Sequence, residues 1–305
     1  MGNGLSSHSA RLPAHTSFLL EALPLARRTR VMDIGANPAN RPAYADLVAG
    51  GGAEVHGFEP GDDAFAKLEE NKSDAEVYYP YAVGAGGNAV FYACENGSFS
   101  SLFRPDVKQV ETLGHWEKSL RVAQEIFLTT LRLDDVTDMV HPDMLKMDTQ
   151  GAELEILRGG QATLSNCVVI MPEVRFFRLY EDEPMLGPLD QQLRDMGFML
   201  HKILPGAVVR LTSSRIGRLR PAMTRNQMVD ADAIYIRDIA RHSEMSNAQL
   251  SHLAVLADAV FKSIDLVLRC LDLLLARDEI AADVIDMYID NLPRNFHVTN
   301  TQEDN

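Results

Sequence analysis

Two short segments in the N-terminal part of the chain carry the residue types of a nucleotide site. The first, Asp33-Ile34-Gly35-Ala36-Asn37, follows an apolar run, and the second, Gly57-Phe58-Glu59-Pro60, ends the next apolar run. Gly35 lets the backbone turn sharply and leaves room for a ligand. A carboxylate at Glu59 can accept hydrogen bonds from both hydroxyls of a ribose. We therefore expect Asp33, Gly35, Asn37 and Glu59 to bind a cofactor, although an Asp-x-Gly turn by itself is also common as a structural turn.

The charge of this turn distinguishes between two nucleotide cofactors. A dinucleotide fingerprint, Gly-x-Gly-x-x-Gly, presents several backbone amides to a pyrophosphate, but here a single glycine lies between Asp33 and Asn37. A carboxylate would repel a pyrophosphate and attract the cationic amino group of a methionine moiety. The turn therefore favours S-adenosylmethionine over NAD, and a dinucleotide-dependent oxidoreductase stays as an alternative.

Three further residues are candidates for chemistry on a methyl acceptor. In methyl transfer from a sulfonium, the enzyme aligns the donor carbon in line with the acceptor oxygen, and a base can take the hydroxyl proton. Asp148 ends the predicted strand 144–147, Lys146 shares a strand face with it, and Glu173 follows the predicted strand 167–171. Asp148, Lys146 and Glu173 are thus the catalytic candidates. The alternative for Asp148 is a cap of the predicted helix 151–157.

Taken together, these segments resemble the FkbM-type methyltransferase family. The similar residues are Asp33–Asn37, Gly57–Pro60, Leu131–Asp135 and Leu145–Glu153, and the resemblance covers residues 30–205. It implies S-adenosylmethionine as cofactor, a class I methyltransferase sheet and a hydroxyl group as the usual methyl acceptor. The family often has glutamate where this chain has Gln150. A methyltransferase-like binding or assembly module without catalytic activity is therefore a second alternative.

Several other residues complete the predicted site. Ala82, in the predicted strand 77–83, is expected to bind the cofactor, and Ser101 and Gln150 are expected to bind the acceptor. Arg218 and Arg220 are also expected at the acceptor, because they belong to an arginine segment without acidic residues, formed by Arg210, Arg215, Arg218, Arg220 and Arg225. Such a segment could bind an anionic acceptor, for example a phosphorylated or nucleotide-linked sugar. The alternative is that these arginines pair with the surplus carboxylates of the protein.

The order of the elements predicts how these residues are positioned. Strands alternate with helices from residue 31 onward, which is typical of a parallel sheet. A β-hairpin is expected at 89–103, and the last two strands at 198–203 and 233–236. With the family resemblance, we expect an α/β, Rossmann-like class I methyltransferase fold. Its sheet would have seven mostly parallel strands, including a parallel sixth strand that ends at the active-site edge, with helices on both faces and a C-terminal helical extension.

Three segments are expected along the chain: an N-terminal tail and helix at 1–29, the methyltransferase domain at 30–240, and the helical extension at 241–305. Apolar residues four and three positions apart indicate a heptad seam in the extension. The seam consists of Leu253, Ala257, Val260, Ile264, Val267, Leu271 and Leu274. It could pair with a second copy in a homodimer or cover the chain's own domain.

Composition limits the remaining possibilities. The chain has 305 residues and a formal net charge of -14, which disfavours nucleic-acid binding. Its three cysteines are widely spaced, so neither disulfides nor a metal site is expected. No apolar run is long enough for a membrane span. We expect a cytoplasmic enzyme that methylates a hydroxyl on a sugar, a glycan or a secondary metabolite.

Overall fold

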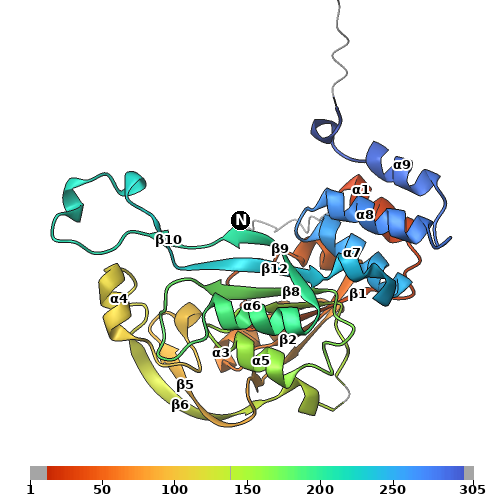
Figure 1. Ribbon diagram of the computed structural model, residues 1–305. Coiled ribbons are helices and arrows are strands. Elements are labelled where there is room, and N and C mark those ends of the chain that lie inside the picture. Colours follow the sequence, from red (N-terminus) through yellow and green to blue (C-terminus); the bar gives the residue numbers. More distant parts are fainter. Residues whose placement is uncertain (1–11, 138, 299–305) are drawn as a thin grey trace, which may run out of the picture. The chain divides into compact units, whose positions relative to one another are not determined.

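The computed structural model describes residues 12–137 and 139–298 (Figure 1). The described residues form two compact units. The first, which we call the sheet unit, contains residues 30–40 and 55–240, and the second, the helical unit, contains residues 12–29, 41–54 and 241–298. Residues 1–11 and 299–305, at the ends of the predicted tail and extension, lie outside the described residues.

A seven-stranded sheet with the order β3-β2-β1-β7-β8-β12-β9 is the centre of the fold. Its strands are β1 (Thr29–Ile34), β2 (Ala53–Phe58), β3 (Glu76–Tyr79), β7 (Met144–Met147), β8 (Val169–Arg175), β9 (Phe198–Pro205) and β12 (Asp230–Arg237). The pairs β2–β3, β1–β7 and β7–β8 are parallel, whereas β12 runs antiparallel to both β8 and β9. Hence β9 is parallel to β8, and the predicted seven-stranded, mostly parallel sheet of an α/β fold is confirmed.

Apolar side chains from the central strands form the core of the sheet unit. Met32, Ile34, Leu145, Met147 and Ile170 are buried there in one cluster, because strands covered on both faces need apolar residues at successive positions. Helices α5 (Glu153–Gly159) and α6 (Leu186–Asp195) pack against each other, and α3 (Asp62–Asn71) packs against β3. This packing fixes the strand ends from which the candidate residues extend.

The predicted third strand, 77–83, is wrong as a single element. Pro80 has no N–H group to donate to a strand ladder, and the chain changes sheets there. Residues 76–79 are β3, whereas β4 (Ala82–Val83) joins a three-stranded sheet with β6 (Val122–Leu131) and β5 (Gly87–Cys94). The predicted hairpin at 89–103 is also corrected, because β5 pairs along its length with β6. Residues 98–103 contribute only an isolated bridge between Ser101 and Tyr92.

In the helical unit, the predicted heptad seam is divided between two helices. Helix α7 (Asn247–Ala259) ends before Lys262, whose φ of 52° is left-handed, and α8 (Ile264–Leu275) follows. The two helices pack against each other, and Leu253, Ala257, Val267, Leu271 and Leu274 are fully buried in the single chain. These five seam residues therefore pack within one chain, as in the alternative in which the seam covers the chain's own surface.

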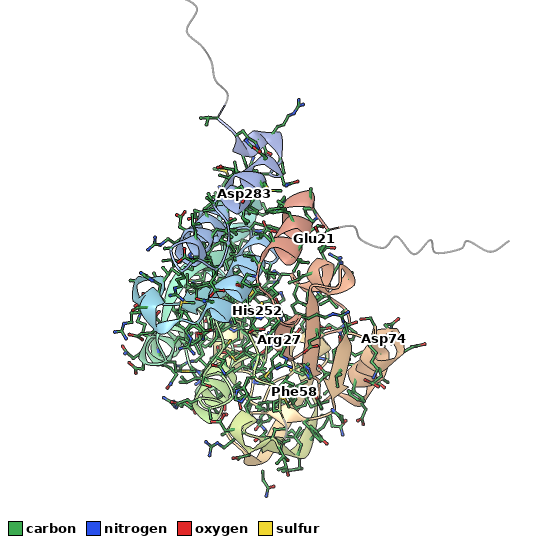
Figure 2. The ribbon with its side chains drawn as sticks, turned by 90° about the vertical axis from the view of Figure 1, so that its right-hand side faces the viewer. Glu21, Arg27, Phe58, Asp74, His252 and Asp283 are labelled. Carbon is green, nitrogen blue, oxygen red and sulfur yellow. The ribbon has the colours of Figure 1, made fainter. Side chains whose placement is uncertain are left out.

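A buried carboxylate joins three helices of the same unit. Asp258 of α7 is fully buried and accepts hydrogen bonds from Thr16 and from Tyr288, at 2.5 and 2.8 Å, and it lies 2.7 Å from Nδ1 of His15. His15 and Thr16 belong to α1 (Ala14–Ala22), and Tyr288 belongs to α9 (Asp283–Asp290). Figure 2 marks these three helices by Glu21, His252 and Asp283. A buried charge needs such partners to offset its lost hydration.

Within residues 12–137 and 139–298, no helix is both long and apolar enough to cross a membrane.

Candidate functional site

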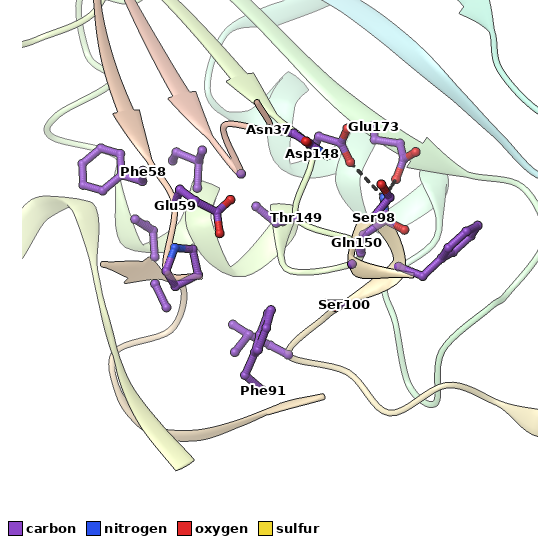
Figure 3. Close-up of a pocket in the computed structure, with 18 of the residues that line it drawn as sticks. Asn37, Phe58, Glu59, Phe91, Ser98, Ser100, Asp148, Thr149, Gln150 and Glu173 are labelled. Atoms are coloured by element: carbon purple, nitrogen blue, oxygen red, sulfur yellow. Dashed lines mark hydrogen bonds between the residues drawn. The ribbon is translucent and has the colours of Figure 1, made fainter. Parts of the chain in front are cut away.

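A cavity of about 350 Å³ lies in the sheet unit where β1, β2 and β7 end (Figure 3). The strand ends and the loops after them contribute Gly35, Asn37, Glu59, Asp148 and Gln150 to its wall. Ala82, Phe91, Phe99 and Trp116 line it from the other segments of the unit, and Glu173 and Arg175 from β8. The cavity thus collects most of the predicted candidates in the crevice at the carboxyl ends of parallel strands, where α/β sheets commonly bind ligands.

The turn at Gly35 joins three strands at the floor of the cavity. Gly35 has a φ of 85°, and a β-carbon there would overlap the backbone oxygen of Asp148. The N–H groups of Gly35 and Ala36 both donate to the carbonyl of Phe58, at 3.0 Å each. Asp148 donates its N–H to the carbonyl of Ile34, also at 3.0 Å. Only glycine fits this conformation at this distance, so the predicted role of Gly35 has a defined structural cause.

Glu59 presents its carboxyl group to the cavity (Figure 3). Its Oε1 accepts a hydrogen bond from the N–H of Gly61 at 2.7 Å. Burial raises the pKa of Glu59 to about 7, the Gly61 hydrogen bond opposes this shift, and the charge of Asp33 adds to it. Ala82 and Phe58 lie on the cavity wall as apolar surface. This combination fits a nucleoside: the ribose hydroxyls can donate to the carboxylate, and the base can lie against the apolar wall.

Asp33, predicted to bind the cofactor, and Lys146, predicted to be catalytic, do not line the cavity. Asp33 is buried, and its Oδ1 is 3.7 Å from Nζ of Lys146, which is also 3.9 Å from Oδ2 of Asp148. Burial lowers the pKa of Lys146, but the surrounding carboxylates, Asp33 and Asp148 first among them, outweigh burial and raise it. Lys146 is therefore placed as a cation between two carboxylates, and it is unsuited to be a base at the acceptor.

Gln150 is the centre of the hydrogen-bond network beside the cavity. Its Nε2 donates to Oδ1 of Asp148 and to Oε2 of Glu173, at 2.9 Å each (Figure 3). Its Oε1 accepts from Arg175 at 2.7 Å and from the hydroxyl of Tyr180 at 2.9 Å. The amide thus uses both of its N–H groups and both lone pairs. The neutral amide adds no further negative charge between the carboxyl groups of Asp148 and Glu173 and donates to both, which gives a physical reason for glutamine at this position in this chain.

Arg175 holds the acidic side of the cavity together. It contacts Glu173 at 2.6 Å, Asp230 at 3.1 Å and Glu183 at 3.6 Å. Burial lowers the pKa of Arg175, but these carboxylates, Glu173 first, outweigh burial and raise it. Burial raises the pKa of Glu173 well above its usual value, Arg175 opposes this shift, and Asp148 reinforces it. Glu173 lies within β8, not after the strand as predicted.

Ser101, predicted to bind the acceptor, and Glu153, at the end of the family-like segment, have supporting positions. Ser101 is fully buried, donates to the backbone oxygen of Gln150 at 2.6 Å and accepts from the N–H of Phe103 at 2.9 Å. It does not line the cavity, so the prediction that it binds the acceptor directly is corrected. Glu153, at the start of α5, accepts from the N–H and the hydroxyl of Thr149 and from the N–H of Gly151. Glu153 therefore fixes the loop that carries Gln150.

The structure places Arg218 and Arg220 away from this cavity. Arg218 ends the short 3-10 helix Ile216–Arg218, Arg220 precedes the next one, and both are exposed. Neither lines the cavity. Among the described residues, no carboxylate forms an ion pair with any of the five residues of the arginine segment. The alternative in which these arginines neutralise surplus carboxylates is therefore wrong for the described part of the chain.

Other lining residues were missed by the sequence analysis. Phe91, Phe99 and Trp116 form an aromatic part of the wall, and the rings of Phe99 and Trp116 lie 5.7 Å apart. Asp230 adds a fourth carboxyl group to the lining. Trp116 is the single tryptophan of the sequence, which was a usable signal. The sequence has no comparable signal at Phe91, Phe99 or Asp230. Their positions depend on how β5, the turn after it and β12 are placed in the fold.

The cavity fits S-adenosylmethionine in size and in chemistry. Its volume is within the usual range of small-molecule sites, roughly 300–1,000 Å³. Glu59 suits a ribose, the apolar wall at Phe58 and Ala82 suits an adenine, and the carboxylate of Asp148 suits a cationic sulfonium or ammonium group. Gly35 and Asn37 also line the cavity, and Gly35 has no side chain that would obstruct a ligand there.

No curated protein matches the chain. Among solved structures, similar folds include precorrin-6y C5,15-methyltransferase from Geobacter metallireducens, with 13% identity, a TM-score of 0.36, and coverage of 73% of this chain and 87% of that chain. Another is magnesium protoporphyrin IX methyltransferase from Synechocystis with bound SAH, with 8% identity, a TM-score of 0.35, and coverage of 70% and 75%.

The sequence match is the decisive comparison, because it covers more than half of the chain and includes the cavity floor and the Gln150 loop. The methyltransferase FkbM domain family matches residues 33–200. The chain therefore belongs to the FkbM family of S-adenosylmethionine-dependent methyltransferases.

Proposed function

We propose that this protein is an O-methyltransferase that acts on a hydroxyl of a small molecule or glycan. The observation that carries the proposal is the position of Asp148. Its carboxylate lines the cavity, follows the strand beside the Gly35 turn, and is held by the amide of Gln150 at 2.9 Å. Asp148 thus lies where the cofactor end of the cavity meets its aromatic and acidic end.

The residues at the cofactor end would hold S-adenosylmethionine. Glu59 would accept hydrogen bonds from the ribose, and Gly35, Asn37 and Ala82 would form the surface against which the nucleoside lies. When bound, the cofactor supplies an electrophilic methyl group that an oxygen nucleophile can displace from sulfur. Asp33 and Lys146 do not line the cavity, and their ion pair would hold β1 and β7 together next to this end.

Asp148 is the best candidate to take the proton from the acceptor hydroxyl. Its side chain is 36% exposed, against 19% for Glu173. The Oε2 of Glu173 already accepts from Gln150 and Arg175, and burial raises its pKa well above the usual value. Glu173 would therefore orient the network, while Asp148 accepts the proton as the oxygen–carbon bond forms.

The aromatic wall supports a sugar or another ring-shaped acceptor. Phe99 and Trp116 adjoin the Gln150 side of the cavity, because the hydroxyl of Tyr180 lies within donating distance of both the backbone oxygen of Phe99 and Oε1 of Gln150, at 3.0 and 2.9 Å. Flat apolar faces of this kind bury the body of a ring while its polar groups stay hydrogen-bonded. This arrangement would present one hydroxyl of such a ring to Asp148.

The first test is calorimetry with S-adenosylmethionine and with NAD, followed by detection of S-adenosylhomocysteine after incubation with sugars, glycosides and phenols. We expect binding of S-adenosylmethionine and turnover with at least one hydroxyl compound. Asp148→Asn should keep cofactor affinity within about twofold and lower turnover by roughly 10²–10⁴-fold, the range of general base catalysis. Asp195→Asn, at an exposed site on α6, is the matched control and should retain both.

Three results would contradict the proposal. Binding of NAD but not of S-adenosylmethionine would favour the oxidoreductase alternative. Cofactor binding without turnover on any hydroxyl compound would favour the non-catalytic module. Full turnover by Asp148→Asn would remove the assigned role of this carboxylate.

A further inference from the structure

A second cavity, of about 490 Å³, adjoins the first in the sheet unit. Trp116 and Ala207 line both cavities. One ligand of moderate length can therefore contact Trp116 and have groups in each of the two spaces.

The two cavities have opposite charge. The first is lined by four carboxyl groups, Glu59, Asp148, Glu173 and Asp230, and by Arg175, which is paired with two of them. The second is lined by Arg210, Arg225 and His115. Among the described residues, none that lines the second cavity carries a carboxylate. A ligand that spans both would be neutral or cationic at Asp148 and anionic at the two arginines.

The second cavity is built on ordered, packed elements. Strands β10 (Val208–Val209) and β11 (Gln227–Met228) pair antiparallel, and the N–H of Asn226 donates to the carbonyl of Val209 at 3.1 Å. Arg210 directly follows β10, and Arg225 lies two residues before β11, so the two arginines leave the same end of this hairpin.

Helix α4 (Val107–Leu113) closes the other side of the cavity. The N–H of Thr212 donates to the carbonyl of Thr112 at 2.9 Å. The β-carbon that Gly114 lacks would overlap the hydroxyl of Thr212. Leu113 and Val209 share one apolar cluster. Backbone pairing and packing therefore fix the main chain beside Arg210 and Arg225.

We propose that the methyl acceptor is a phosphorylated hydroxyl compound that occupies both cavities. Arg210 and Arg225, which form no ion pair within the described chain, would bind its phosphate through forked, charge-assisted hydrogen bonds. The ring of Trp116 would contact the body of the acceptor, and a hydroxyl would lie at Asp148. This inference rests on the proposed methyltransferase function, and it assigns phosphate binding to Arg210 and Arg225, while Arg218 and Arg220 lie outside both cavities.

The single tryptophan provides a direct test, because Trp116 lines both cavities and no other residue contributes tryptophan fluorescence. Glucose 1-phosphate, glucose and inorganic phosphate would be titrated into the wild-type protein, Arg210→Gln/Arg225→Gln, and the matched control Arg218→Gln/Arg220→Gln. We expect glucose 1-phosphate to change the fluorescence of the wild type and the control with similar dissociation constants. Its affinity for Arg210→Gln/Arg225→Gln should be at least about tenfold lower. Glucose should bind all three proteins equally, and inorganic phosphate should show the same loss as the sugar phosphate.

Calorimetry with S-adenosylmethionine on the same three proteins separates this inference from the proposed function. Equal cofactor affinity shows that the variants are folded. If the wild type binds the cofactor but the three proteins bind glucose 1-phosphate equally, or the control loses affinity as much as Arg210→Gln/Arg225→Gln, the phosphate site is wrong and the methyltransferase proposal stands. Absence of any response to both phosphate compounds in the wild type would also overturn it. Failure to bind S-adenosylmethionine would instead contradict the proposed function.

Discussion

Glu59 shows how burial gives one side chain both a binding role and a pH dependence. Its carboxyl group lines the cavity and accepts from Gly61 at 2.7 Å, and burial raises its pKa to about 7. The ionised carboxylate has acceptor oxygens for both ribose hydroxyls, whereas protonation converts one oxygen into a donor and weakens this binding. Near neutral pH, a large fraction of the free protein must therefore lose a proton before it binds a nucleoside.

We expect S-adenosylmethionine to bind the wild-type protein roughly tenfold more weakly near pH 6 than near pH 8, because protons compete for Glu59 across this interval. In Glu59→Gln, which has no titratable group there, binding should be weaker overall and this part of the pH dependence should be lost. Calorimetry at both pH values measures the two effects, and the cofactor's own amino group titrates equally in both proteins. Equal pH dependence in the two proteins would show that Glu59 is not the titrating group.

At the scale of elements, the loop between β7 and α5 determines whether the site is assembled. Gln150 has a φ of 58°, uncommon for a residue with a side chain, and Glu153 holds the loop through the N–H groups of Thr149 and Gly151. The side chain of Gln150 then connects this loop to β8 through Glu173 and Arg175. Gln150 is thus held through its loop by Glu153 and through its side chain by Glu173 and Arg175.

Gln150→Glu should destabilise the protein by roughly 1–3 kcal/mol at pH 8, because it removes two N–H donors and adds a carboxylate beside Asp148 and Glu173. The pKa of the new carboxyl should be raised by these neighbours, so the loss of stability should be small at acidic pH and grow as pH rises above the pKa of the unfolded chain. Urea unfolding at several pH values measures this trend.

Gln191→Glu is the control for this substitution, because Gln191 is exposed on α6 and donates to Asp195 at 2.8 Å. Water screens an added charge there, and the change in stability should stay within about 0.5 kcal/mol. If both variants lost stability equally, the network around Gln150 would have no special dependence on a neutral residue.

At the scale of the whole molecule, most of the apolar residues of the heptad seam are buried within a single chain. Leu271 of α8 is fully buried in the helical unit. Leu271→Ala should therefore lower the free energy of unfolding by about 2–5 kcal/mol, as for other buried leucines. The unfolding midpoints of wild type and variant should not depend on protein concentration, because no second chain is needed to bury the seam.

Met287→Ala, at a side chain of α9 that is 47% exposed, is the matched control and should change stability by less than about 0.5 kcal/mol. Denaturation at two protein concentrations about a hundredfold apart provides the measurement. A midpoint that rises with concentration in the wild type, but not in Leu271→Ala, would show that the seam forms a dimer.

The sequence by itself determined that the sheet is mostly parallel and that Gly35 and Glu59 lie at the ends of neighbouring strands. Both positions depend on local backbone freedom and on where one strand ends. The parallel order followed from the alternation of strands and helices, which is also local. The strand break at Pro80 was present in the sequence, but its effect on β3 and β4 was not anticipated.

Only the tertiary structure decided which side chains surround Gln150 and Arg175 and against which surface the heptad seam packs. The partners of Gln150 and Arg175 come from segments far apart in the chain, namely Asp148, Glu173, Tyr180 and Asp230, and no periodicity relates them. Likewise, the heptad spacing showed which residues of 253–274 would be buried but not against which surface, since one apolar stripe can pack on any other. Hydrophobic burial has no direction, and side-chain hydrogen bonds require distances that only the folded chain sets.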